Sequence, residues 1–128
     1  MIVLDASIAI ALLDADDAHH HTAVALLGEH VDDDLAISTL TLAEVLVRPA
    51  QLGAAERIDA GLRSLGVTTL ALGADAALEL AHVRAATGLR MPDAVVLHAA
   101  ETAGAALATA DRVLLSAARA RGVVVLAA

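Results

Sequence analysis

Short aliphatic runs alternate along the chain with longer segments in which apolar residues recur every three or four positions. The short runs predict strands at residues 2–5, 35–38, 67–72, 105–109 and 123–127. The longer segments predict helices at residues 7–14, 18–30, 40–48, 54–65, 74–87, 93–103 and 112–121, with Pro92 in a first helical turn. Strands that are aliphatic throughout and separated by helices are typical of a parallel sheet covered on both faces. The pattern therefore predicts a three-layer α/β fold around a mostly parallel five-stranded sheet.

The chain length and composition narrow the class of protein. With 128 residues and no repeat, low-complexity linker or other boundary, we expect residues 1–128 to form one domain. Hydrophobic residues make up 59% of the chain, but no apolar stretch reaches the roughly 18 residues that a membrane span needs. The first residues also lack the pattern of a secretory signal, so we expect a cytoplasmic protein with no membrane partner. Because there is no cysteine, any metal must be held by oxygen or imidazole.

Charge is distributed unevenly, with a net value of −8. The first 44 residues contain acidic residues and no arginine, and all eight arginines follow. The net negative charge of the chain repels nucleic acid, so overall electrostatic attraction cannot hold the two together. The absence of Phe, Trp and Tyr also removes the side chains on which bases stack. A nucleic-acid contact must therefore be local. Arg90 and Arg112 are candidate RNA-binding residues, although most arginines of such a chain lie on solvated helix faces.

Four carboxylates adjoin aliphatic runs where a buried core would be expected: Asp5, Glu44, Asp93 and Asp111. Burying a charge alone costs more than the net stability of a small domain, so each carboxylate needs a partner. The chain has no lysine, and no arginine lies beside Asp5 or Glu44 in the sequence. A divalent metal ion held by several carboxylates is the leading explanation. The carboxyl-terminal edge of the parallel sheet is the place where such a site would form.

Each of these acids also has an ordinary structural interpretation. Asp5 and Asp111 could cap the helices that follow them, and Asp93 could favour a helix N-terminus through the helix dipole. Glu44 has no capping role, but it could lie on an exposed stripe and pair with Arg48 one turn later. The set of four is a stronger indication of function than any one member.

Four segments in order resemble a PIN-domain ribonuclease, and in particular the VapC-type toxin of a toxin–antitoxin pair. They are Asp5-Ala6-Ser7, the stretch from Ser38 through Glu44 to Leu46, Met91-Pro92-Asp93-Ala94 and Thr109-Ala110-Asp111. The resemblance covers essentially the whole chain. It implies endonucleolytic cleavage of RNA with Mg²⁺ or Mn²⁺ as the cofactor, a cognate antitoxin protein as partner, and a homodimer.

The resemblance assigns roles to particular residues. Asp5, Glu44, Asp93 and Asp111 become both the metal ligands and the catalytic residues, and a metal-activated water would hydrolyse the phosphodiester bond. Ser7 and Thr109 place hydroxyls two residues from a key aspartate, where they could orient a carboxylate or a water. Either could equally be an ordinary cap.

Other classes of protein fit the sequence less well. A receiver domain or a haloacid-dehalogenase-type phosphatase employs a lysine that this chain lacks, and a dinucleotide-binding protein needs a glycine fingerprint after the first strand. Three adjacent histidines, His19 to His21, cannot easily share one ion, because consecutive helical residues point in different directions. They are better explained as a polar helix start. The alternative that stays open is a non-catalytic protein that binds a basic partner peptide through its acidic pocket.

Overall fold

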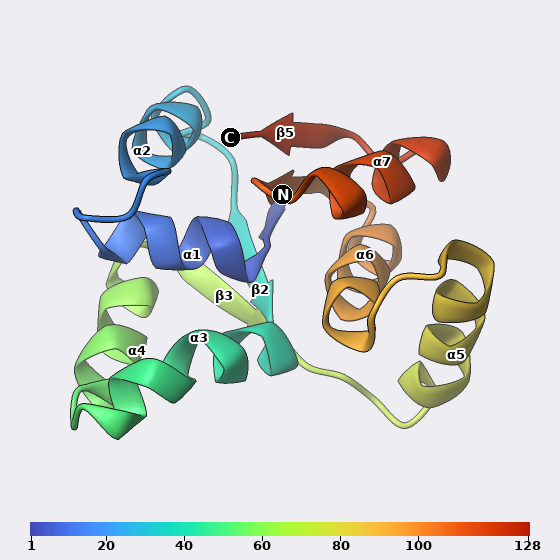
Figure 1. The fold of residues 1–128 in the computed structure, drawn as a ribbon, viewed down its shortest axis with the longest axis horizontal. Coiled ribbons are helices and arrows are strands. Elements are labelled where there is room, and N and C mark those ends of the chain that lie inside the picture. The colour runs from blue at the N-terminus through green and yellow to red at the C-terminus, as the bar shows by residue number, and fades with distance from the viewer.

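The computed structural model describes all 128 residues and contains every predicted strand and helix, with ends displaced by three residues or fewer (Figure 1). The elements follow in the order β1 (Ile2–Leu4), α1 (Ala6–Leu13), α2 (His20–Gly28), β2 (Leu35–Ser38), α3 (Thr39–Gln51), α4 (Ala55–Ser64), β3 (Val67–Leu70), α5 (Ala76–Thr87), α6 (Met91–Ala103), β4 (Ala106–Thr109), α7 (Arg112–Ala120) and β5 (Val125–Ala127).

The five strands form one sheet in the order β3-β2-β1-β4-β5, and every neighbouring pair is parallel. The prediction of a parallel sheet is confirmed. The chain moves outward from β1 to β3 and then returns to place β4 on the other side of β1. Strand order therefore reverses between β1 and β4, and the crevice beyond the carboxyl ends of these two strands is where open α/β sheets bind ligands.

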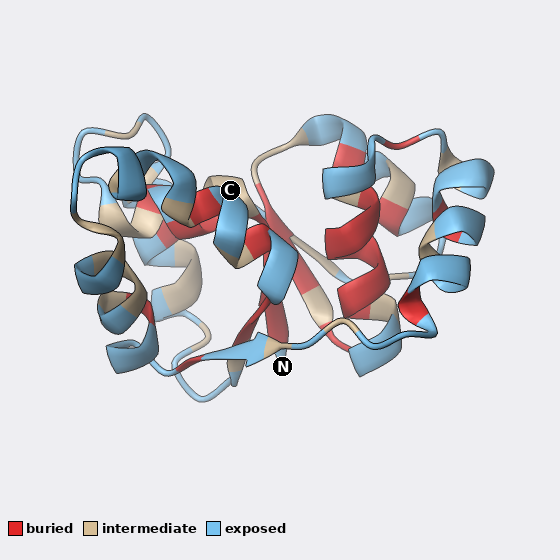
Figure 2. Ribbon diagram, turned by 90° about the horizontal axis from the view of Figure 1, so that it is seen from below, coloured by how far each residue is buried: buried red, intermediate tan, exposed pale blue.

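Helices cover both faces of the sheet, and each face has its own hydrophobic core. In β1, Val3 packs with residues of α6 and α7, whereas Ile2 and Leu4 pack with α1 and α3. This division follows from the alternation of side chains along a strand. Figure 2 shows buried residues concentrated in the central strands and in α6. The predicted three-layer arrangement is confirmed, and it brings α1, α3 and α6 to the edge where β1 and β4 end.

Helix α3 is longer than predicted. The predicted helix ended at residue 48, directly before Pro49. The helix instead continues through Pro49 to Gln51, and the backbone N–H of Leu52 donates to the carbonyl of Arg48. Pro49 has no backbone N–H to donate to the carbonyl four residues earlier, and helical hydrogen bonding resumes after it with Leu52. Pro92, by contrast, lies in the first turn of α6, as predicted.

None of the seven helices combines the length and hydrophobicity that crossing a bilayer requires.

Candidate active site

Four elements bring the predicted acids to one pocket. Asp5 follows β1 directly and Asp111 comes two residues after β4, so neighbouring parallel strands deliver both to the same sheet edge. Glu44 lies in α3 and Asp93 in the first turn of α6. The pocket has a volume of about 260 Å³ and is lined by Asp5, Ala6, Ser7, Thr41, Glu44, Arg90, Pro92, Asp93, Val96 and Asp111. Residues separated by more than 100 positions in the sequence thus meet in one small space.

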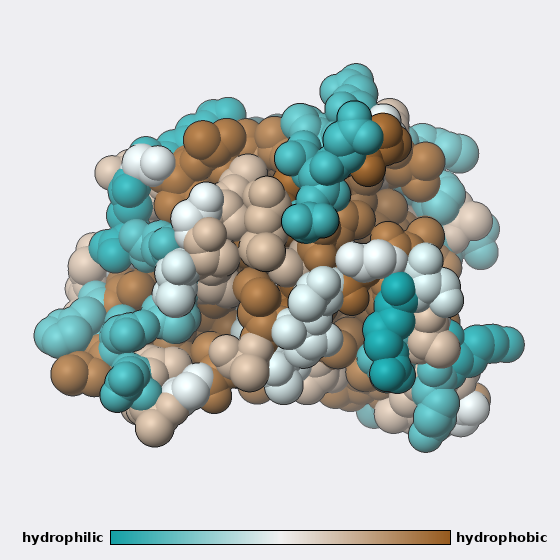
Figure 3. Space-filling model, turned by 180° about the vertical axis from the view of Figure 1, so that it is seen from behind, coloured by the Kyte–Doolittle hydropathy of each residue, from teal (hydrophilic) through white to brown (hydrophobic).

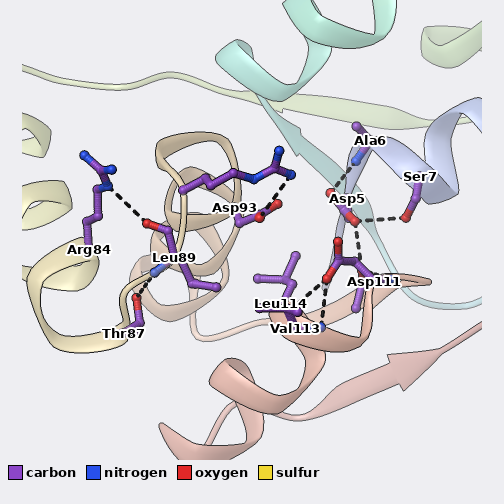
Figure 4. Close-up of polar contacts among 12 residues, drawn as sticks. Asp5, Ala6, Ser7, Arg84, Thr87, Leu89, Asp93, Asp111, Val113 and Leu114 are labelled. Atoms are coloured by element: carbon purple, nitrogen blue, oxygen red, sulfur yellow. Dashed lines mark hydrogen bonds and ion pairs between the residues drawn. The ribbon is translucent and has the colours of Figure 1, made fainter.

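Asp5 is the most firmly held of the four acids. Its side chain is only 6% exposed. One carboxylate oxygen accepts from the backbone N–H of Ala6 at 2.7 Å, which caps α1, and the other accepts from the hydroxyls of Ser7 at 2.9 Å and Thr109 at 2.8 Å (Figure 4). Both predicted supporting hydroxyls therefore orient Asp5. Asp5 therefore caps α1 and lines the pocket at the same time.

The same hydroxyls connect Asp5 to the chain after β4. The backbone N–H of Ala110 donates to the Ser7 hydroxyl at 3.2 Å, and the backbone N–H of Asp111 donates to the Thr109 hydroxyl at 2.9 Å. Asp111 in turn caps α7, because one of its oxygens accepts from the backbone N–H groups of Val113 and Leu114 at 2.9 and 3.0 Å. Capping occupies only that oxygen, Oδ1, so the residue can both cap the helix and face the pocket.

Glu44 and Asp93 have perturbed proton affinities. Partial desolvation, followed by repulsion from Asp5 and Asp93, raises the pKa of Glu44 above its ordinary value. Burial, followed by repulsion from Asp111 and Asp5, raises the pKa of Asp93. Arg90 acts in the opposite direction on both pKa values but does not cancel the increase. The pocket therefore holds more negative charge than its own residues neutralise.

The two candidate RNA-binding arginines are placed differently. Arg90 lines the pocket and forms an ion pair with Asp93 at 3.7 Å, while its side chain stays largely exposed. Arg112 is exposed in the first turn of α7, next to Asp111 in the chain but not in the pocket lining.

No ion pair joins Glu44 to Arg48, so the interpretation of Glu44 as one half of a surface pair has no support in the structure.

Thr41 is a pocket residue that the sequence analysis missed. It lies on α3 one turn before Glu44, and its hydroxyl is buried in the pocket lining without a hydrogen-bond partner. The spacing of three residues was a usable signal, because side chains at i and i+3 share one face of a helix.

The pocket offers only oxygen ligands, which suit Mg²⁺ or Mn²⁺. Its excess negative charge and its partnerless hydroxyl also fit a bound cation. No group of three or more acidic or imidazole side chains is arranged in the structure to hold one ion. This arrangement is compatible with Mg²⁺, which commonly uses one or two carboxylates and retains several waters. Asp93 already lines the pocket, and a closer ligand set would require it to exchange its ion pair with Arg90 for the cation.

The histidines lie apart from this pocket. His98 is buried on α6, its Nε2 pairs with the Glu79 carboxylate at 2.5 Å, and it does not line the pocket of the four acids. His20 begins α2 and its Nδ1 contacts the Ala11 carbonyl oxygen, in agreement with a polar helix start. His30 contacts Asp33 at the surface.

Comparison with known proteins assigns the family. A family model described as the PIN domain matches residues 2–120. The chain belongs to the PIN domain family. No curated protein sequence matches this PIN domain. Its fold is similar to that of VapC20 from Mycobacterium tuberculosis, described as a sarcin–ricin loop cleaving toxin, with 21% identity, coverage of 91% of this chain and 95% of the other, and a TM-score of 0.76.

Two further structures share the PIN fold. One chain of a toxin–antitoxin complex from Klebsiella pneumoniae is 23% identical in sequence to this chain, with 87% of each chain covered and a TM-score of 0.71. PAE2754 from Pyrobaculum aerophilum is 29% identical, with coverage of 97% of this chain and 82% of the other and a TM-score of 0.64. The resemblance drawn from the four sequence motifs is thus confirmed at the level of family and fold.

Proposed function

We propose that this PIN-domain protein is the toxin of a toxin–antitoxin pair and acts in the cytoplasm as a Mg²⁺- or Mn²⁺-dependent endoribonuclease. The observation that carries the proposal is the convergence of Asp5, Glu44, Asp93 and Asp111 on one pocket beyond the ends of β1 and β4. The M. tuberculosis neighbour is described as a sarcin–ricin loop cleaving toxin, and this description supports RNA as the substrate.

The four acids would hold the divalent ion, with Asp5 as the fixed ligand and Asp93 as a ligand that exchanges Arg90 for the ion. When bound, the ion would lower the pKa of a water molecule and stabilise the charge that develops on the phosphodiester. Ser7 and Thr109 keep the Asp5 carboxylate in one orientation through their hydroxyls. Such orientation of a metal ligand by hydroxyl groups preserves affinity and geometry.

The raised pKa values of Glu44 and Asp93 describe the pocket without a cation. There the two acids repel their neighbours, and a cation or a proton relieves the repulsion. A divalent ion held by these carboxylates would thus be stabilised by the same negative charge that raises their proton affinity, which supports a metal site in this pocket.

RNA would approach an acidic protein through local positive charge. Arg90 stands at the pocket rim with much of its side chain in solvent, where it can exchange Asp93 for a phosphate oxygen. Arg112 lies exposed beside Asp111 and could contact a phosphate farther along the strand. With a net charge of −8, these local contacts have to overcome repulsion between the protein and the RNA backbone.

We also propose an antitoxin and a second copy of this chain as protein partners. The K. pneumoniae neighbour is a toxin–antitoxin complex, and an arginine or lysine of an antitoxin could enter the acidic pocket in place of the metal.

The proposed homodimer rests on the apolar surface. Figure 3 shows apolar residues across much of the middle of one face, and several large side chains such as Leu52, Leu65 and Leu78 are exposed. Contiguous apolar surface commonly marks association, whereas single exposed apolar side chains are ordinary. Sedimentation that shows only monomer over a wide concentration range would contradict the homodimer.

The activity is tested by incubating purified protein, stripped of metal, with RNA. Cleavage should require added Mg²⁺ or Mn²⁺, stop on addition of EDTA and return when the ion is restored. Strong cleavage in EDTA would contradict the metal-dependent mechanism. A folded protein that binds its antitoxin but cleaves no RNA with either ion would favour the alternative, a non-catalytic PIN protein that binds a basic partner peptide through the acidic pocket.

A further inference from the structure

The hydroxyl of Thr41 is the one buried hydroxyl of the acidic pocket that has no hydrogen-bond partner. Ser7 and Thr109 both donate to Asp5 and both accept from a backbone N–H group. Thr41 is only 1% exposed, so bulk water does not satisfy its hydroxyl. This difference separates Thr41 from the hydroxyls that hold the pocket together.

The missing partner is unusual for a threonine in a helix. Such a hydroxyl commonly bonds the carbonyl three or four residues earlier, yet that of Thr41 makes no such bond in α3. A buried hydroxyl without a partner destabilises a fold, whereas a valine would occupy nearly the same volume without this penalty. The protein residues around Thr41 therefore give no reason for threonine at this position, whereas a polar group bound in the pocket would supply one.

We propose that Thr41 is a positioning residue that donates a hydrogen bond to a water molecule in the coordination sphere of the divalent ion. The inference rests on the proposed function, because it takes the acidic pocket to be the metal site. Thr41 lies one helical turn before Glu44, so both side chains face the pocket from the same side of α3. The pocket has a surplus of acceptor oxygens and few donors, and a water between Thr41 and the carboxylates would satisfy the hydroxyl.

The oxygen that Thr41 contacts could also belong to the RNA, and metal affinity in the absence of RNA distinguishes the two sources. A contact to a water of the ion is present whether or not RNA is bound. A contact to a phosphate oxygen exists only in the RNA complex. Hydrogen bonds to the ligands of a metal typically change its affinity by about 10–100-fold, which is within reach of a titration.

The test measures Mn²⁺ affinity by calorimetry in the parent protein and in Thr41→Val, Thr41→Ser and Ser38→Ala. We expect Thr41→Val to weaken Mn²⁺ binding about tenfold and Thr41→Ser to restore it. Ser38 is the matched control, because its hydroxyl is also fully buried and partnerless but lines a different pocket with His98. Ser38→Ala should bind Mn²⁺ as the parent protein does.

Thermal melting in EDTA provides a second readout. Without metal, Thr41→Val should melt at the same temperature as the parent protein or higher, because the substitution removes an unsatisfied hydroxyl. A lower melting temperature would assign the hydroxyl a structural partner and overturn the proposal. Unchanged Mn²⁺ affinity, with or without a weaker interaction with RNA, would also overturn it. If the parent protein itself binds no Mn²⁺, the proposed function fails and the Thr41 proposal fails with it, whereas parent-like binding by Thr41→Val refutes only the latter.

Discussion

Replacement of Asp5 by alanine should destabilise the metal-free protein far more than replacement of Asp93. Asp5 accepts three hydrogen bonds, and the Thr109 hydroxyl that donates one of them is fully buried. Loss of the helix cap costs about 1 kcal/mol. Leaving the Thr109 hydroxyl without its charged acceptor costs about 1.5–3 kcal/mol, and Ser7, which is only half-buried and can reach water, adds less.

These effects together predict a loss of about 3–5 kcal/mol for Asp5→Ala. Relief of repulsion between Asp5 and the other acids returns a fraction of this, so we expect a net loss of about 2–4 kcal/mol. Asp93 makes no hydrogen bond that the fold needs, and its ion pair with Arg90 is long, at 3.7 Å, and exposed on the arginine side. Asp93→Ala should therefore change stability by no more than about 0.5 kcal/mol.

Urea unfolding in EDTA, followed by far-ultraviolet circular dichroism, measures both variants, because the chain has no aromatic residue to serve as a fluorescent probe. Asp5→Asn is an intermediate case: the amide oxygen can keep the cap, but the amide nitrogen cannot accept from Ser7 or Thr109. It should lose less stability than Asp5→Ala. Equal stabilities of Asp5→Ala and Asp93→Ala would refute the assignment of Asp5 as the centre of the hydrogen-bond network.

Three further predictions concern the charge of the pocket. Asp93→Asn and Glu44→Gln should each stabilise the metal-free protein at neutral pH by about 0.5 kcal/mol after solvent screening. Because folding raises the pKa of both carboxyls, this gain is full at a pH above the folded-state pKa values and disappears below the ordinary values, 3.8 for Asp93 and 4.5 for Glu44. Urea titrations at several pH values measure it. Arg90→Gln should strengthen Mn²⁺ binding without RNA, since the guanidinium no longer competes for Asp93, and weaken RNA binding, both measurable by titration. Raising Mg²⁺ should weaken the antitoxin complex, and Asp93→Asn should weaken it too; affinity unchanged by either treatment would place the antitoxin outside the pocket.

The sequence was sufficient to predict the fold because each element carries its own local signal. Uniformly aliphatic runs such as Ile2–Leu4 identify buried parallel strands, and the periodic segments between them identify helices. The predicted end of α3 at residue 48 was wrong: the helix continues through Pro49 to Gln51, although a proline disfavours helical backbone in the residue before it. Element ends depend on such local balances, whereas the existence of an element depends on the whole segment.

The acids of the pocket could be predicted, but the side chains that surround them could not all be. The four acids, Asp5, Glu44, Asp93 and Asp111, adjoin or interrupt apolar runs. The sequence alone is enough to identify a charge in such a place. For Thr41 the sequence offers only its place one turn before Glu44, because threonine is ordinary in a helix and its lack of a hydrogen-bond partner is a property of the folded structure. Capping and pocket roles likewise could not be separated from sequence, and for Asp5 and Asp111 the structure places the two together.

The most direct test of the metal-dependent nuclease site compares RNA cleavage by the parent protein, Asp93→Asn and Asp75→Asn at saturating Mn²⁺. Asp75 is a matched control, because it is an exposed aspartate at the start of α5 whose side chain makes no capping hydrogen bond and does not line the pocket. We expect Asp93→Asn to lose more than about a hundredfold in cleavage rate, because removing a proposed metal ligand should have a larger effect than removing a supporting group. Asp75→Asn should cleave RNA at the parent rate, and both variants should remain folded. Cleavage by Asp93→Asn at the parent rate would contradict the assignment of this pocket as the catalytic site.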